Sequence, residues 1–409
     1  MDRRTITAYR ARWVFPIDRE PIEDGVVTVG SDGLIVDVGS QPTEGAKTVD
    51  LGNVALLPGL INAHTHLEFS LFGRPFGEPG TSFSEWLRRV VAWRRDQPAV
   101  LGQEELALIQ GLQEVRATGT AAIGEIATPI FADHWLNEPN DQAGVVFFEL
   151  LSLNPARVGP LLHQAEEYLL PGVQGNQQRG LSPHAPYTVH PDLLAGAVKL
   201  STERKCSLTM HLAESREELE LLDAQTGPLV ELLKSLSAWY PESLSKGRRP
   251  LDYLHVLAQS HSALIAHGNY LQPDEIAFAA EHRDRLTIVY CPRTQSYFDH
   301  DPYPLAAMLA AGARVAVGTD SRASNPDLSV WKELQHVRAN HSAVAPDQIL
   351  RMGTIHGAEG LGLQESLGTI SPGKRAVFTT IQLANEQTDA YDLLFAGEQI
   401  THPTYQTEC

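Results

Sequence analysis

Between residue 54 and about residue 362, the chain repeats one pattern, a short apolar run typical of a buried strand followed by an amphipathic stretch typical of a helix. The apolar runs end near His66, Glu125, Leu151, His184, His211, His267, Cys291 and Asp320. The helical stretches are Phe83–Arg95, Gln103–Thr118, Pro191–Glu203, Arg216–Leu222, Pro273–Glu281, Pro304–Ala311 and Leu328–Asn340. Repeated strand–helix units predict parallel strands, so we expect an α/β fold built on a (β/α)8 TIM barrel.

The two ends of the chain carry a different pattern, in which short β-like runs alternate with turns. These runs are Ile6–Ala11, Gly25–Val29, Leu34–Val38, Gly368–Ile370 and Ala376–Ile381. In residues 1–53 they predict a small antiparallel sheet. Because 409 residues exceed the ~250 typical of such a barrel, we expect residues 1–53 and 363–409 to form one discontinuous β-sandwich domain beside a barrel of residues 54–362.

The composition excludes several classes of protein. Acidic residues outnumber basic residues 50 to 32, for a formal charge of -18, which disfavours a nucleic acid partner. Met1–Ala8 is not followed by the apolar core of a signal peptide, and no run approaches the ~20 apolar residues of a membrane span. The cysteines form no C-x-x-C pair; they are Cys206, Cys291 and Cys409. We therefore expect a cytoplasmic protein without nucleic acid or membrane as a partner.

The first apolar run ends in two histidines, His64 and His66, that are separated by one residue. Residues i and i+2 of a strand face the same side, so both imidazoles can reach one metal ion. An isolated H-x-H also occurs as two solvated histidines at a strand end. The strand itself is expected to begin at Val54 and to continue through a kink at Pro58-Gly59.

Other apolar runs also end in polar residues. His211 is followed by Glu214, and two later runs end at His267 and Asp320. Each has an ordinary alternative explanation: a solvated strand-end pair, a histidine at the barrel rim, and an aspartate that caps the next helix. Together they are hard to obtain by packing alone, because cores fill strands with aliphatic side chains. Since the carboxyl ends of barrel strands meet at one mouth, the pattern predicts a metal and acid–base site there.

These residues resemble the motifs of a known family, the metal-dependent amidohydrolase superfamily, in its cytosine deaminase, guanine deaminase and chlorohydrolase-like branch. The matching stretches cover essentially the whole chain in the family's order; they are Pro58–His66, His211–Glu214, His267-Gly268, Cys291–Thr294 and Gly318–Asp320. Two positions depart from the branch: Thr294-Gln295 stands where Ser-Asn is usual, and Val377 replaces an aspartate.

Carried over residue by residue, the resemblance implies metal ligands and catalytic residues. The ligands would be His64, His66, His211 and Asp320. The catalytic residues would be Glu214, which protonates the substrate ring, His267, which orients the metal-bound water, and Asp320, which accepts that water's proton. Binuclear members carry a bridging lysine or acid at the fourth strand, and residues 179–187 contain no lysine. We therefore expect one divalent metal ion, zinc first and iron as the alternative, and the resemblance suggests a homodimer.

A narrower resemblance is to the aminodeoxyfutalosine deaminases of menaquinone biosynthesis, carried by Asn62–Ser70, Phe83–Leu87 and Gly124–Ile126. The implied substrate-binding residues are His184, Glu68, Trp86, Arg293 and Ser321. Three of them have ordinary explanations: His184 as a loop histidine, Glu68 as a loop-anchoring carboxylate and Trp86 as a core aromatic.

We therefore expect an aminohydrolase that releases ammonia from an adenine-type ring, with aminodeoxyfutalosine or a related adenine nucleoside as its small-molecule substrate. The first alternative is a hydrolase of guanine, a triazine or a cyclic amide. The second is a non-catalytic, ligand-binding paralogue, although the retention of Glu214 with all inferred ligands argues against it. A carboxylated nucleoside would need a cation, for which Arg74, Arg88 and Arg89 are candidates; solvated arginines on an amphipathic helix are the alternative for Arg88 and Arg89.

Overall fold

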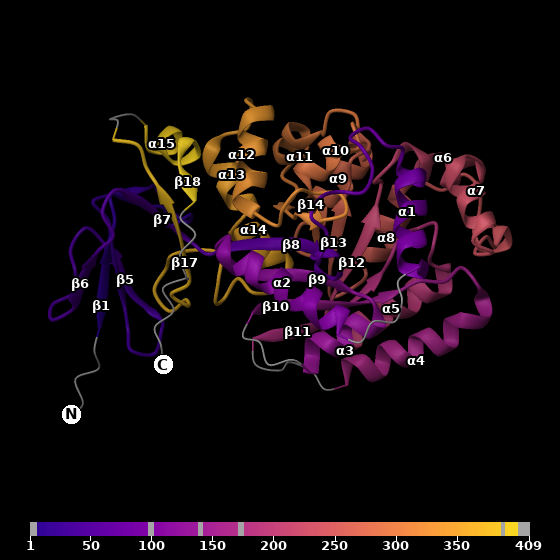
Figure 1. The fold of residues 1–409 in the computed structure, drawn as a ribbon, viewed down its shortest axis with the longest axis horizontal. Helices are drawn as coiled ribbons and strands as arrows, with labels where there is room; N and C mark the ends of the chain where they lie inside the picture. Colours follow the sequence, from indigo (N-terminus) through magenta and orange to yellow (C-terminus); the bar gives the residue numbers. More distant parts are fainter. Residues whose placement is uncertain (1–5, 97–101, 138–141, 171–175, 386–388, 400–409) are drawn as a thin grey trace. The chain divides into compact units, whose positions relative to one another are not determined.

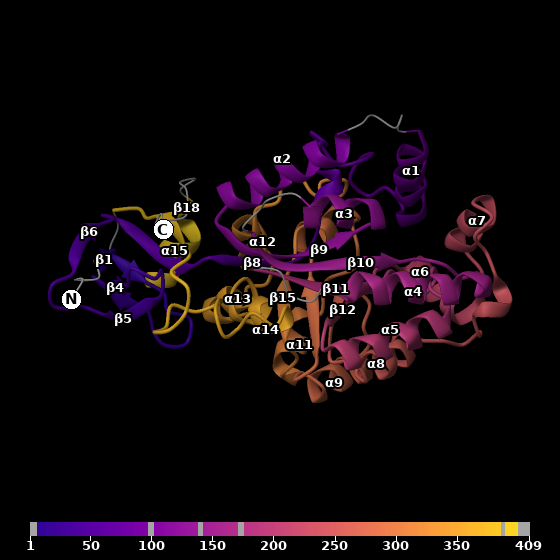
Figure 2. The same ribbon diagram turned by 90° about the horizontal axis from the view of Figure 1, so that it is seen from below.

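The computed structural model describes residues 6–96, 102–137, 142–170, 176–385 and 389–399. The chain divides into two compact units. One unit comprises Met1–Asn62, Gln113–Ala122 and Ser329–Cys409, and the other comprises Ala63–Leu112 and Ile123–Leu328. Figures 1 and 2 show the elements in two views.

The largest element of the structure is a curled, parallel sheet of nine strands, in the order β15-β14-β13-β12-β11-β10-β9-β8-β16 (Figure 1). The strands are β8 (Leu60–His66), β9 (Thr120–Ala127), β10 (Ala143–Leu150), β11 (Gln177–Pro183), β12 (Ser207–Leu212), β13 (Ser262–His267), β14 (Leu286–Tyr290), β15 (Val315–Val317) and β16 (Asp320–Ser321). Most of their residues are buried, as expected for strands covered on both faces. The architecture is mixed α/β and consistent with a TIM-like barrel.

The two edge strands of this sheet are joined by only two residues. β15 pairs with β14, whereas β16 pairs with β8 through Asp320 opposite Thr65 and Ser321 opposite His66. At the junction, a Cβ on Gly318 would lie 2.8 Å from the Cβ and carbonyl oxygen atoms of His64, which is closer than real Cβ atoms approach. Glycine is therefore required at position 318 for the last strand to pass His64.

Helices connect the strands, and the predicted helical stretches coincide with observed helices to within two residues. Those helices are α1 (Phe83–Asp96), α2 (Gln103–Ala117), α5 (Pro191–Arg204), α6 (Arg216–Ala224), α9 (Pro273–Glu281), α11 (Leu305–Ala311) and α12 (Val330–Asn340). The others are α3 (Pro129–Asn137), α4 (Val158–Leu169), α7 (Pro228–Ser235), α8 (Pro250–Leu257), α10 (Pro292–Tyr297), α13 (Pro346–Met352), α14 (Ile355–Gly360) and α15 (Ala390–Ala396). None of the described helices is both long and apolar enough to cross a bilayer.

The unit with both chain ends contains two small sheets, ordered β5-β4-β1-β6 and β18-β17-β7-β2-β3. Their strands are β1 (Thr7–Arg10), β2 (Trp13–Val14), β3 (Ile22–Glu23), β4 (Val26–Val29), β5 (Ile35–Gly39), β6 (Lys47–Asp50), β7 (Val54–Pro58), β17 (Phe378–Gln382) and β18 (Glu398–Gln399). One buried cluster contains residues of both sheets, such as Val27, Leu56 and Phe378.

Three expectations for these segments are wrong in detail. The first sheet is mixed rather than antiparallel. β4 runs antiparallel to β1 and β5 runs antiparallel to β4, whereas β6 pairs with the other edge of β1 in the parallel direction. Residues 368–370 form no strand, since Gly368 has a φ of +88° that extended strands do not adopt. Val54–Pro58 pairs with β17 and β2 in the small sheet, so the barrel strand begins only at Leu60.

Candidate active site

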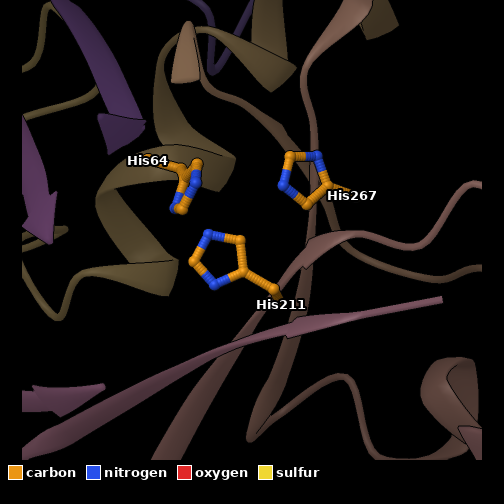
Figure 3. Close-up of side chains that lie close together, drawn as sticks. All are labelled: His64, His211 and His267. Atoms are coloured by element: carbon orange, nitrogen blue, oxygen red, sulfur yellow. The ribbon is translucent and has the colours of Figure 1, made fainter. Parts of the chain in front are cut away.

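The predicted metal ligands meet where β8 and β12 end and β16 begins, because His64 and His66 lie in the last residues of β8, His211 is the penultimate residue of β12, and Asp320 is the first residue of β16. Figure 3 shows His64, His211 and His267 pointing toward one another, with ring centroids 4.9 to 5.5 Å apart. The Oδ1 atom of Asp320 lies 3.8 Å from His64 Nε2 and 3.7 Å from His66 Nε2. Each of the two groups, His64-His211-His267 and His64-His66-Asp320, has its donor atoms within 4.8 Å of one another.

His64 belongs to both of these groups and is the clearest indication that they suit a metal ion. Its side chain is fully buried, and neither ring nitrogen has a hydrogen-bond partner among the described residues. A buried polar group without a partner is costly, so native structures rarely keep one. Burial, followed by the nearby His211 and His184, lowers the pKa of His64. The neutral imidazole retains a lone pair, and this donor set therefore fits a divalent metal ion.

Neighbouring groups orient two of the donors. His211 Nδ1 lies 3.0 Å from the carbonyl oxygen of His184. A carbonyl only accepts, so Nδ1 carries the proton and Nε2 keeps the lone pair that a metal requires. The hydroxyl of Ser324 donates a 2.8 Å hydrogen bond to Asp320 Oδ2.

The backbone turns sharply where the strands reach the site. Ala213, His267 and Asp320 adopt φ values of +54°, +69° and +56°, a left-handed conformation that costs residues other than glycine about 1–3 kcal/mol each. Such strain persists only where the surrounding structure enforces it. These three turns redirect the chain next to the predicted site residues.

Glu214 lies beside the histidine cluster. Its Oε1 atom is 3.5 Å from His267 Nε2, and both side chains are buried. Burial, with added repulsion from Asp320 and Glu218, raises the pKa of Glu214 well above its ordinary value. A raised pKa favours the protonated carboxyl group, the form in which a general acid acts.

A pocket of about 500 Å³, part of it open to solvent, lies over these groups. Three predicted substrate-binding residues line it: His184, Trp86 and Ser321. His184 Nδ1 is 2.7 Å from the hydroxyl of Thr188, and Trp86 Nε1 donates a 2.9 Å hydrogen bond to the carbonyl of Ala323. These bonds fix the orientation of both rings.

The other two predicted substrate-binding residues are not among the described residues that line the pocket. Glu68 forms an ion pair with Arg94 and accepts a hydrogen bond of 3.3 Å from Thr128. Arg293 donates a 2.7 Å hydrogen bond to Asp327 Oδ1.

The sequence analysis missed polar residues of the pocket, namely Arg94, Glu149 and Tyr187. Glu149 is the penultimate residue of β10, so the strand-end reasoning applied to the other strands could have found it. Arg94 lies in the last turn of α1, within the arginine-rich helix, but spacing alone does not tell which arginine faces the site. Arg88 and Arg89 instead pair with Glu85 on the exposed side of that helix.

Comparisons with known proteins match most of the chain. The model of the amidohydrolase family matches residues 55–404. A 5-methylthioadenosine/S-adenosylhomocysteine deaminase from Moorella thermoacetica is 29% identical over 388 residues, which cover 89% of this chain and 82% of that protein. The structure of Helicobacter pylori aminofutalosine deaminase with methylthio-coformycin has a TM-score of 0.80 at 24% identity, covering 96% of this chain and 97% of the other. An adenosine deaminase from Xanthomonas campestris with bound zinc has a TM-score of 0.75 at 22% identity, covering 97% and 90%.

Proposed function

We propose that this chain, which belongs to the amidohydrolase family and is a hydrolase of carbon–nitrogen bonds, releases ammonia from an adenine-type nucleoside. The observation that carries the proposal is a buried Glu214 whose Oε1 atom lies 3.5 Å from His267 Nε2, beside a buried His64 whose ring nitrogens have no hydrogen-bond partner among the described residues. Relatives named as deaminases of adenine nucleosides support the same substrate class.

The proposed metal ligands are His64, His66, His211 and Asp320, holding one divalent ion. Zinc is the first choice because a similar adenosine deaminase contains it, and iron is the alternative. When bound, such an ion supplies an oxygen nucleophile at neutral pH.

The chain's own residues then handle the protons. Glu214 donates its proton to a ring nitrogen, which makes the adjacent carbon electrophilic. It then takes the proton of the new hydroxyl group and passes it to the amine, which leaves as ammonia while the carbonyl forms. Asp320 accepts the proton that the attacking water loses and returns it to Glu214 before the next turnover. His267, whose carbonyl accepts a 2.9 Å hydrogen bond from Tyr303, keeps the attacking oxygen oriented. In the net reaction, an oxygen from water replaces the exocyclic nitrogen.

The pocket walls position the nucleoside. Phe83 and Trp86 stack with ring centroids 6.0 Å apart and offer an apolar face to the base, while His184 and Ser321 supply polar contacts. Glu149 reaches the sugar hydroxyls. Two further residues act without lining the pocket. Glu68 forms an ion pair with Arg94, and Arg293 forms an ion pair with Asp327 that stabilises the loop there.

Within this class, aminodeoxyfutalosine is the first candidate substrate, with Arg94 as the cation for its carboxylate and menaquinone biosynthesis as the pathway. A neutral nucleoside such as 5-methylthioadenosine is the second candidate, because Arg94 already pairs with Glu68. The β-sandwich formed by residues 1–53 and 363–409, the barrel of residues 54–362, the homodimer and the cytoplasmic location stay predictions.

An ammonia-release screen tests the proposal. The metal-loaded protein is given adenosine, 5-methylthioadenosine, a carboxylated adenine nucleoside, guanine and a triazine. Turnover of the adenine nucleosides supports the proposed class. Preference for guanine or the triazine would contradict it in favour of the first alternative, and metal binding without any ammonia release would favour the ligand-binding paralogue.

A further inference from the structure

In the turn that contains Glu214, the backbone N–H groups of Ala213 and Glu214 donate hydrogen bonds to a side chain. β12 ends at Leu212, and Ala213 follows in the left-handed conformation, with a φ of +54°. The carboxylate of Glu218 receives both groups: Oε1 accepts from Ala213 N at 2.9 Å, and Oε2 accepts from Glu214 N at 2.8 Å. Glu218 is fully buried and lies in the first turn of α6.

The carbonyl groups of Ala213 and Glu214 are held by residues that follow β13. Asn269 Nδ2 donates a 2.8 Å hydrogen bond to the carbonyl oxygen of Glu214, and Tyr270 N donates to that of Ala213 at 3.1 Å. Glu218 is itself anchored, because its N–H donates to the hydroxyl of Ser215, the N-cap of α6, at 3.1 Å. Both the N–H and the C=O groups of the turn are therefore fixed.

We propose that Glu218 is a positioning residue for Glu214. Its carboxylate sets the peptide plane from which the Glu214 side chain extends to within 3.5 Å of His267. Glu218 does not line the pocket in the described part of the chain, so it acts through Glu214 rather than on the substrate. The inference rests on the proposed function, in which Glu214 transfers the proton.

The substitution Glu218→Gln tests the role because the side chain keeps its size but loses one acceptor. A carboxylate accepts at both oxygens, whereas a glutamine amide presents an oxygen and an NH2 group that donates. One of the two N–H groups would then face another donor, and the turn would tilt. Because a misplacement of about 1 Å at a catalytic group costs up to ~100-fold in rate, we expect kcat to fall at least tenfold while KM changes less than threefold.

Glu275 provides a matched control. It is also fully buried in the first turn of a helix, α9, and its oxygens accept from Gln272 N at 2.8 Å and Leu251 N at 3.2 Å. It does not line the pocket described above. Glu275→Gln should lower the melting temperature about as much as Glu218→Gln does, yet leave kcat within twofold of the wild type.

Hydrogen exchange gives a readout that does not depend on activity. In Glu218→Gln, the amides of Ala213 and Glu214 should exchange faster than in the wild type and in Glu275→Gln, with metal content unchanged. Glu218→Asp keeps both acceptor oxygens on a side chain that is one methylene shorter. Its kcat should lie between those of the wild type and Glu218→Gln, and it replaces the glutamine variant in the test if that variant does not fold.

Unchanged protection of these amides in a folded Glu218 variant would overturn the inference, and so would an equal kcat loss in Glu275→Gln. If the wild type releases no ammonia from any nucleoside, the proposed function fails. The exchange data would still decide whether Glu218 holds the turn.

Discussion

The hydroxyl of Ser324 donates a 2.8 Å hydrogen bond to the Oδ2 atom of Asp320, and both side chains are buried. Because Oδ1 is the oxygen that faces His64 and His66, this bond fixes the carboxylate with one oxygen directed at the histidines. Ser324→Ala should therefore weaken metal retention or activity by about 10- to 100-fold, the range for partners that orient a metal ligand. Chelator competition measures the effect. Ser260→Ala is the control. It removes an equally buried hydroxyl, which donates a 2.7 Å hydrogen bond to the carbonyl oxygen of Leu257, and should leave metal retention and activity unchanged.

Removing a proposed ligand should abolish stoichiometric metal. We expect about one metal ion per chain in the wild type, and loss of that ion in His66→Ala and Asp320→Ala, because each leaves an incomplete coordination shell. Elemental analysis after dialysis measures the content. His163→Ala, at an exposed position on α4, is the control. Wild-type metal content in both ligand variants would refute the assigned site, and two tightly held ions would refute the single-metal prediction.

Glu214→Gln should keep its metal but lose turnover by roughly 100-fold or more, because the amide cannot transfer a proton. The raised pKa of Glu214, caused first by burial, also sets a pH dependence. The protonated group is the active form, so activity persists above the pH at which an ordinary glutamate ionises and falls on the alkaline side. Steady-state kinetics from pH 5 to 10 would show this decrease in activity at alkaline pH. Undiminished turnover in the variant would mean that another group protonates the ring.

Arg94 should determine whether a carboxylated nucleoside is preferred. If it binds the substrate carboxylate, Arg94→Gln should raise KM for that nucleoside by about 10- to 100-fold, the value of a charged hydrogen bond, and leave adenosine almost unaffected. Arg88→Gln is the control, since Arg88 pairs with Glu85 on the exposed side of α1. Equal use of both nucleosides by the wild type would exclude the carboxylated substrate and leave the neutral one.

Glu149 should recognise the sugar. It lines the pocket and is 8% exposed, so its oxygens are available to ribose hydroxyls. Glu149→Gln should raise KM for adenosine about tenfold, because a charge-assisted hydrogen bond is lost. The same variant should treat 2′,3′-dideoxyadenosine as the wild type does. A similar KM increase for both nucleosides would show that Glu149 shapes the pocket without contacting the hydroxyls.

The strand ends could be predicted from the sequence because two simple rules combine. Apolar runs locate the strands, and parallel topology brings their carboxyl ends to one mouth, so His64, His211 and Asp320 converge despite their separation along the chain. Arg94 was missed in favour of candidates such as Arg88, because both lie on one amphipathic helix and the face of that helix that packs against the site is set by tertiary packing. Gly368 likewise escaped prediction, since its left-handed conformation depends on the chain around it rather than on local β propensity.

The glycine junction between β15 and β16 has a consequence for the order of events during synthesis. His64 and Asp320 are separated by more than half of the chain, and they meet only when the passage of Gly318 beside His64 lets β16 pair with β8. A chain still on the ribosome that lacks residue 320 contains only three of the four proposed ligands. The complete ligand set therefore assembles only after β16 pairs with β8, and an ion held by it would link the first strand of this sheet to the last.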